Sequence, residues 1–183
     1  MWRILIILVL LGPLRSVRGE PNESHQSYLA ADLGLAVFGE AAHREYIARA
    51  FALAARGGLR WEGWGAYVQL ETASWFAAEG STSDALTGVI NVGLGAEYLY
   101  ADGFVRTALA TGPSILVMGT ELDDVGEIGF FFELRPAGLR WAVADQVVIG
   151  LDPLVLSLTA PVLEGIPLIE LEYRTTMVVE WLF

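Results

Sequence analysis

Hydrophobic and polar residues alternate with a period of two along most of the chain beyond residue 27. The alternation is clearest in the last segment, where one set of positions is apolar or aromatic and the other set is mostly polar or charged. The first set is Ile169, Leu171, Tyr173, Thr175, Met177, Val179, Trp181 and Phe183, and the second is Glu170, Glu172, Arg174, Thr176, Val178, Glu180 and Leu182. Such alternation predicts β-strands with two different faces.

Eight segments with this pattern are expected to be strands, at residues 28–39, 46–56, 60–73, 89–101, 104–118, 126–143, 147–160 and 166–183. The segment 40–56 is the least clear, because its alanines would also suit a helix. We assign it to a strand because an odd number of strands would leave an up-and-down barrel unclosed or force a parallel pair. The expected connections alternate between short ones, at 57–58, 101–103 and 144–146, and mostly longer ones, at about 40–45, 74–88, 119–125 and 161–165.

The alternation changes phase at two places that contain proline. One lies at Pro136-Ala137-Gly138, and the other at Asp152-Pro153. A β-bulge adds one residue to a strand and moves the following side chains to the other face, and proline and glycine are tolerated there. We therefore expect two bulges within long strands.

The first 19 residues have the features of a secretory signal peptide. Arg3 precedes an uncharged apolar run at residues 4–14, and small residues follow before a predicted cleavage after Gly19. The run is shorter than the ~20 residues that a spanning helix needs. An N-terminal anchor helix is the alternative. The expected organisation is a signal peptide at 1–19, a polar segment at 20–27 and a barrel domain at 28–183.

Alternation alone does not say which face of the sheet is inside. In a soluble lipocalin-like barrel the apolar face would line the interior, and the charges would face water. In a membrane barrel the apolar face meets lipid and the polar face lines the lumen. Glycine and charge dominate the polar faces, which suits a narrow lumen where side chains meet across a small radius.

With the apolar faces outward, the lumen is expected to hold a plug of ion pairs. Its members would be Asp32, Glu71, Glu97, Arg106, Glu127, Glu133, Arg135, Arg140, Glu170, Glu172, Arg174 and Glu180. These are eight acidic residues against four arginines. Buried charges must be paired or neutralised, and an arginine can hold two carboxylates. A narrow proton or cation path is the alternative to a structural plug.

Composition limits the possible chemistry. There is no cysteine, which rules out disulfides and thiolate metal sites, and the net charge of −11 argues against binding to nucleic acid. The only histidines are His25 and His43, so no catalytic constellation and no cofactor are predicted. His43 with Glu40 or Glu45 is a weak candidate, and a solvated loop histidine is the simpler interpretation.

An acidic loop is a weak candidate for binding divalent cations. Its carboxylates are Glu121, Asp123, Asp124 and Glu127. Hard cations prefer such oxygen ligands, but the spacing does not match a calcium-binding EF-hand loop. A solvated acidic hairpin is the plainer interpretation, and cations bridging these carboxylates to lipopolysaccharide phosphates are a further possibility.

The signal peptide, the alternation and the C-terminal segment together resemble the small eight-stranded outer-membrane β-barrel proteins of Gram-negative bacteria. The resemblance implies an all-β, antiparallel up-and-down transmembrane barrel with short periplasmic turns and modest extracellular loops. It also implies that a C-terminal signal is read by the barrel-assembly machinery. That signal would comprise Tyr173, Met177, Val179, Trp181 and Phe183.

The expected location is therefore the bacterial outer membrane, and the expected partners are outer-membrane lipids and lipopolysaccharide. The expected function is a non-enzymatic structural or surface-interaction role. The alternatives are an outer-membrane lipid-modifying enzyme or lipid-transport barrel, and a soluble periplasmic lipocalin-like binding barrel.

Overall fold

The protein is described by a computed structural model that covers residues 25–40, 47–76, 86–118, 127–163, 166–167 and 169–183. Eight long strands and one short one make up this part of the chain. They are β1 (Gln26–Glu40), β2 (Ile47–Trp61), β3 (Trp64–Phe76), β4 (Leu86–Tyr100), β5 (Val105–Met118), β6 (Glu127–Ala144), β7 (Val147–Leu163), the two-residue β8 (Ile166–Pro167) and β9 (Glu170–Leu182). Among these residues, no helix is long and apolar enough to cross a bilayer.

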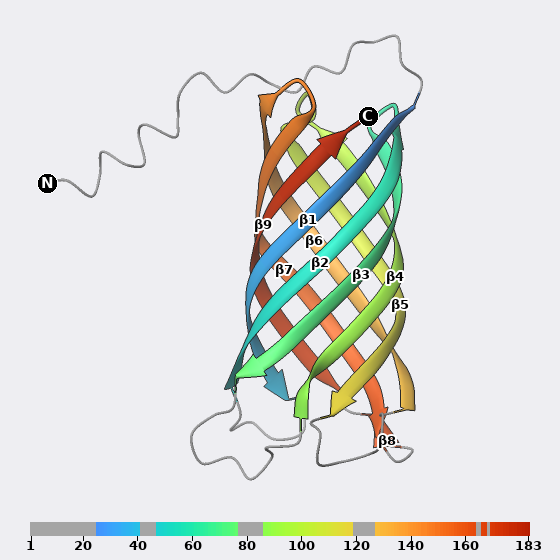
Figure 1. The fold of residues 1–183 in the computed structure, drawn as a ribbon, viewed down its shortest axis with the longest axis vertical. Helices are drawn as coiled ribbons and strands as arrows, with labels where there is room; N and C mark the ends of the chain where they lie inside the picture. Colours follow the sequence, from blue (N-terminus) through green and yellow to red (C-terminus); the bar gives the residue numbers. More distant parts are fainter. Residues whose placement is uncertain (1–24, 41–46, 77–85, 119–126, 164–165, 168) are drawn as a thin grey trace, which may run out of the picture.

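The eight long strands form a closed antiparallel barrel (Figure 1). Neighbours in sequence pair with one another from β1 to β7, β7 pairs with β9, and β9 pairs with β1. Closure removes the exposed edges that an open sheet would present. The predicted eight-stranded up-and-down barrel is therefore confirmed, including a strand from Ile47 onward where a helix was the competing interpretation.

The start of β1 and the end of β9 lie at one end of the barrel, which we call the turn end (upper end in Figure 1). The backbone amide of Phe183 donates to the carbonyl of Ser27 there, at 2.9 Å. The tight β2–β3 connection at Glu62-Gly63 has φ angles of 48° and 88°, as in the type I′ turns that match strand twist. The opposite end, where β1 ends and β2 begins, is the loop end.

The predicted turn at Gly57-Gly58 is wrong. Both glycines lie inside β2 and are paired with Leu29 and Tyr28 of β1. A Cβ at Gly58 would lie 2.5 Å from the Ala66 carbonyl oxygen and 2.8 Å from the Tyr28 ring. The glycine pair therefore permits a close approach within the wall, and the chain turns five residues later than predicted, at Glu62-Gly63.

Both predicted bulges are present as breaks in strand register. The β6–β7 register shifts on either side of Ala137, and the β7–β9 register shifts between Asp152 and Val155. A proline cannot donate to the ladder, and the break also frees carbonyls. The Pro136 carbonyl accepts the Thr107 hydroxyl.

The Pro153 carbonyl is satisfied in the same way, by hydroxyls on the neighbouring strand β9. The Thr175 hydroxyl donates to it at 3.0 Å and the Tyr173 hydroxyl at 3.4 Å. Backbone groups that face lipid must find partners within the protein, because the bilayer core offers none. Outward-facing hydroxyls thus compensate the broken ladder at both bulges.

The apolar faces of the strands point outward and the charged faces point inward. Leu94, Met177 and Phe183 are 68%, 66% and 67% exposed, whereas Glu133 and Arg135 are fully buried. This distribution is opposite to that of a soluble barrel with an apolar interior. The membrane-barrel orientation of the faces is therefore the one that the structure has.

Candidate functional site: the charged lumen

The lumen is filled by charged side chains that form one connected set of ion pairs, which we call the lumen network. Each of the eight long strands contributes at least one member. The members are Asp32, Arg56, Arg60, Glu71, Glu97, Arg106, Glu133, Arg135, Arg140, Asp152, Glu172, Arg174 and Glu180. They are six arginines and seven acids, and all are buried.

In the turn half of the lumen, three arginines surround two glutamates. The Glu180 carboxylate accepts from Arg140 at 2.6 Å, from Arg106 at 2.8 Å and from Arg60 at 3.1 Å. Arg60 also donates to Glu97 at 2.5 Å. Glu180 in β9 therefore ties together β2, β5 and β6, although none of these strands is its neighbour in the sheet.

In the centre of the lumen, two aspartates join the turn half to the rest. Asp152 accepts from Arg106 at 2.7 Å and from Arg135 at 2.8 Å. Asp32 accepts from Arg135 at 2.6 Å and from Arg56 at 2.8 Å. Asp152 lies at the β7 bulge, so the side-chain network is continuous where the backbone ladder is broken.

In the loop half of the lumen, a single arginine serves three glutamates. Arg174 forms ion pairs with Glu71 at 2.7 Å, with Glu172 at 3.3 Å, and with Glu133. Arg135 reaches Glu133 at 2.7 Å and so connects this group to the centre. The fork of donors on a guanidinium is suited to bridging carboxylates in this way.

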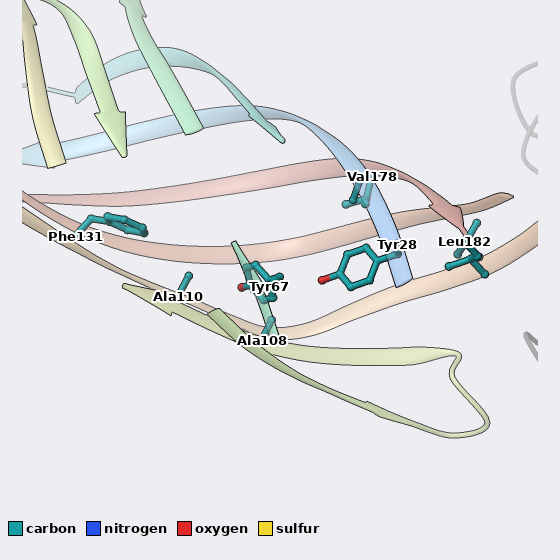
Figure 2. Close-up of a cluster of buried hydrophobic side chains, with 9 residues drawn as sticks. Tyr28, Tyr67, Ala108, Ala110, Phe131, Val178 and Leu182 are labelled. Atoms are coloured by element: carbon teal, nitrogen blue, oxygen red, sulfur yellow. The ribbon is translucent and has the colours of Figure 1, made fainter. Parts of the chain in front are cut away.

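Aromatic side chains occupy lumen space that glycines leave free. The Tyr67 ring lies where a Cβ of Gly95 would be, and the Phe131 ring lies 2.5 Å from the Cβ position of Gly93. Figure 2 shows Tyr67 and Phe131 pointing into the interior from different strands. A narrow barrel accepts such rings only opposite positions without a side chain.

The turn end of the lumen is closed by apolar contacts. Tyr28, Val148 and Leu182 are buried there in one cluster, of which Figure 2 shows Tyr28 and Leu182. The Arg60 guanidinium lies 3.8 Å from the centroid of the Tyr28 ring, which adds a cation–π contact to the closure. The space between side chains beside Glu71 and Arg174 has no room for a water molecule.

The structure brings together most of the predicted lumen residues. Those whose side chains it places in the network are Asp32, Glu71, Glu97, Arg106, Glu133, Arg135, Arg140, Glu172, Arg174 and Glu180. The side chains of Glu127 and Glu170 lie outside the described part. Glu121, Asp123 and Asp124 of the acidic loop also lie outside the described residues, as do His43 and Glu45.

Three members of the network were not predicted from the sequence, and the expected ratio of eight acids to four arginines was wrong, because six arginines are buried in the lumen. Arg56 and Arg60 lie at the ends of the two predicted strands that border the glycine pair interpreted as a turn, and neither was assigned to the lumen. Asp152 lies at the bulge, where counting alternate positions along the strand does not show whether a side chain points into the lumen or outward. Arg56 could have been found from the alternation. It follows Ala52 and Ala54 at every second position, and the pattern continues through Gly57-Gly58.

The predicted assembly-signal residues lie on the outer surface of β9 and just beyond it. Tyr173, Met177, Trp181 and Phe183 are exposed, and Val179 is half-buried. Other aromatic residues gather on the outer surface near the turn end. Trp64 and Tyr98 have ring centroids 4.8 Å apart, and Tyr98 and Tyr100 stack at 6.3 Å. Within the described residues, no group of three or more acidic or histidine side chains is arranged to hold a metal ion.

Comparisons with known proteins support the fold. No family model and no curated protein matches the sequence. Among solved structures, the chain is similar to Neisserial surface protein A, with 15% sequence identity and a TM-score of 0.65, covering 85% of this chain and 96% of that one. It is also similar to Ail, the attachment invasion locus protein of Yersinia pestis, with 13% identity and a TM-score of 0.55, covering 88% and 100%.

A second structure of Ail, in complex with the heparin analogue sucrose octasulfate, matches with a TM-score of 0.51, 13% identity and the same coverage of 88% and 100%. These neighbours are small eight-stranded outer-membrane β-barrels, so the resemblance drawn from the sequence is confirmed at the level of fold.

Proposed function

We propose that this protein is a non-enzymatic integral outer-membrane barrel whose lumen is plugged by ion pairs and whose role is structural or in surface contact. The observation that carries the proposal is the inverted distribution of side chains. Exposed residues such as Leu35, Leu94 and Met177 would lose an unfavourable contact with water on entering lipid. The charged residues would stay shielded inside.

The plug accounts for the charges without a transported substrate. Every charged member of the lumen network has at least one ion-pair partner within 4 Å, and the turn end is closed by Tyr28 and Leu182. Three outward hydroxyls are also engaged, because Thr107, Thr111 and Thr175 donate to wall carbonyls. A lipid-modifying enzyme would need an unengaged polar group directed at lipid, and these three hydroxyls are not available for that role.

Surface contact would take place at the loop end. The connecting segments at 41–46, 77–85 and 119–126 join the strands there, and the last of them contains Glu121, Asp123 and Asp124. We propose that these carboxylates contact lipopolysaccharide through divalent cations or bind a cationic surface. During biogenesis, the outward Tyr173, Trp181 and Phe183 would be read by the barrel-assembly machinery.

The test is refolding of residues 20–183 into detergent micelles and lipid vesicles, followed by gel electrophoresis with and without boiling, and by conductance in planar bilayers. A closed membrane barrel should change mobility on boiling, and a plugged lumen should give no conductance steps. A chain that folds as a soluble monomer without detergent would contradict the membrane location. Regular conductance steps would contradict the plug while leaving the membrane location intact.

A further inference from the structure

Two glutamates from strands that are not neighbours meet in the loop half of the lumen. Glu71 lies in β3 and Glu133 in β6, with β4 and β5 between them in the sheet, and both side chains are fully buried. The Oε2 atoms of both carboxyl groups contact the same nitrogen, Arg174 Nη2, which lies 2.7 Å from Glu71. A side-chain hydrogen bond also joins the two carboxyl groups. The two glutamates, which we call the glutamate pair, are therefore in direct contact across the lumen.

A hydrogen bond between two carboxyl groups requires a proton. An ionised carboxylate has only acceptor oxygens, whereas a protonated one also has an O–H donor. Two ionised carboxylates at this separation repel each other, so a close pair holds one proton between them where an isolated carboxyl group would be ionised. The space beside Glu71 and Arg174 has no room for a water molecule that could screen the repulsion.

The partners of the two carboxyl groups differ, and the difference assigns the proton to Glu71. Glu133 accepts from two guanidinium groups, from Arg135 at 2.7 Å and from Arg174. Two adjacent positive charges favour the ionised form of Glu133. Glu71 shares Arg174 and otherwise accepts from neutral groups. These are the side-chain amides of Asn91, at 3.1 Å, and Gln69, at 3.5 Å.

Two aspartates in the centre of the lumen provide a contrast. Asp32 and Asp152 also share one guanidinium nitrogen, Arg135 Nη1, at 2.6 Å and 2.8 Å. Each of them contacts a second arginine as well, Asp32 with Arg56 at 2.8 Å and Asp152 with Arg106 at 2.7 Å. Both aspartates can therefore be ionised, and their contacts require no proton.

The other charged and titratable groups that face the glutamate pair come from several strands. They are Arg174 and Glu172 of β9, Arg135 of β6, Asp32 of β1, Arg56 of β2, Asp152 of β7 and Tyr67 of β3. The Tyr67 hydroxyl donates to the Leu109 carbonyl at 3.2 Å. The residues of β4 and β5 that follow Glu71 in the register of the sheet are the neutral Asn91 and Ser114.

We propose that Glu71 and Glu133 form a proton-binding site inside the plug, in which Glu71 carries the proton and donates it in a hydrogen bond to the Glu133 carboxylate. The inference rests on the ion-pair plug of the proposed function and adds a bound proton to it. The proton is taken up from solvent as the barrel folds and is released as it unfolds. At neutral pH the folded barrel then holds one proton more than the unfolded chain, in which both glutamates are ionised, so its stability falls as the pH rises.

Infrared spectroscopy of the refolded protein in lipid vesicles tests the site directly, because a protonated carboxyl group absorbs separately from a carboxylate. At about pH 7 to 8, where exposed glutamates and aspartates are ionised, the wild type should show a protonated-carboxyl band. Glu71→Gln removes the titrating group and keeps an N–H donor for Glu133, so it should fold and lack the band. Asp32→Asn is the matched control. It also changes a carboxyl group at a shared arginine nitrogen into an amide, and it should keep the band.

Urea unfolding in the same vesicles, between about pH 6 and 8, counts the protons that folding takes up. The unfolding equilibrium constant of the wild type should rise with pH more steeply than that of Glu71→Gln, by up to about tenfold per pH unit for one proton. Both proteins contain His25 and His43, so the contribution of the histidines cancels in the comparison.

A wild-type spectrum without a protonated-carboxyl band would overturn the proposal, because both glutamates would then be ionised. A band that persists in Glu71→Gln would also overturn it, since the proton would lie elsewhere, and so would parallel pH dependences of the wild type and Glu71→Gln. Conductance of the same samples tests the plug separately. A barrel that shows neither conductance steps nor the band would sink this inference and leave the proposed function standing.

Discussion

Gly138 and Asp152 offer a test of how the lumen network compensates the β7 bulge. A Cβ built at Gly138 overlaps Asp152 Oδ1, and the carboxylate there joins Arg106 to Arg135. Gly138 is not among the residues with positive φ, so its backbone conformation is open to alanine. The whole cost of Gly138→Ala should therefore come from displacing the Asp152 carboxylate.

The magnitude follows from the ion pairs that Asp152 makes. Removing one partner of a buried ion pair costs about 3–5 kcal/mol. After Asp152→Ala, Arg106 would keep its hydrogen bond to Glu180 at 2.8 Å, and Arg135 would keep its hydrogen bond to Asp32 at 2.6 Å. The loss of stability should therefore lie near the lower end of this range, at about 3 kcal/mol. Gly138→Ala should cost about 2–3 kcal/mol, because turning the carboxylate away breaks the same two ion pairs.

The two substitutions should therefore not be additive. In the Asp152→Ala background the clash is gone, and adding Gly138→Ala should cost less than about 0.5 kcal/mol, giving a coupling of about 2 kcal/mol. The assay is urea unfolding in lipid vesicles followed by tryptophan fluorescence. Gly57→Ala is the control, because its Cβ would approach the flexible Leu29 side chain at 3.1 Å and would lie at an ordinary contact distance of 3.9 Å from the Tyr28 carbonyl oxygen. Additive costs in the double variant would refute the reasoning.

Three further predictions address the outer face, the bulge and the packing of the lumen. Met177→Arg places a charge on a side chain that is 66% exposed in the middle of β9, and it should cost about 2–4 kcal/mol in vesicles, whereas Met177→Leu should be nearly neutral in the same unfolding assay. Thr175→Val removes the hydroxyl that donates to the Pro153 carbonyl and should cost about 1 kcal/mol, while Thr175→Ser should retain most of the stability. The Cβ of Gly95→Ala would overlap the Tyr67 ring, and the substitution should cost about 1–3 kcal/mol of stability. A destabilisation no larger than that of Gly57→Ala would contradict this prediction, because it would show that the Tyr67 ring can move aside at little cost.

The faces of the strands could be predicted from the sequence because a period of two leaves little ambiguity over long segments. In β9 the outward Leu171, Tyr173 and Met177 and the inward Glu172 and Arg174 all follow from alternation alone. The breaks in alternation also located both bulges. Which face met lipid was a separate question, and the buried charges of the lumen answer it.

Glycine was the main source of error. A Gly-Gly pair between apolar segments ordinarily marks a turn. In this barrel Gly57-Gly58 lies within β2, where Tyr28 and Tyr67 approach the position that a Cβ of Gly58 would occupy. The approach of rings from other strands depends on the curvature of the closed sheet, which no local pattern encodes. The same error hid Arg60, since it was assigned to the start of the following strand.

The pairing of charges could not be predicted either, because it depends on strand register around the whole barrel. Arg135 of β6 reaches Asp32 of β1, and Arg174 of β9 reaches Glu71 of β3. None of these pairs lies on adjacent strands. Alternation shows that such residues share the lumen, but the stagger of the closed sheet decides which of them lie at the same height.

These cross-lumen pairs suggest why the interior is charged when an apolar filling would also exclude water. In the bilayer core the outer face is surrounded by hydrocarbon and not by water. The hydrophobic effect therefore does not by itself favour one strand register over another. A slip of one residue would move Glu180 or Arg106 from the lumen to the lipid-facing side, at a cost of several kcal/mol per charge. The lumen network therefore penalises wrong registers as well as filling the barrel, and it ties together strands that no backbone ladder joins. Because the lumen network fixes the cross-section of the barrel, it also holds the strand ends at the loop end in one arrangement. A surface-contact role would need such a fixed arrangement.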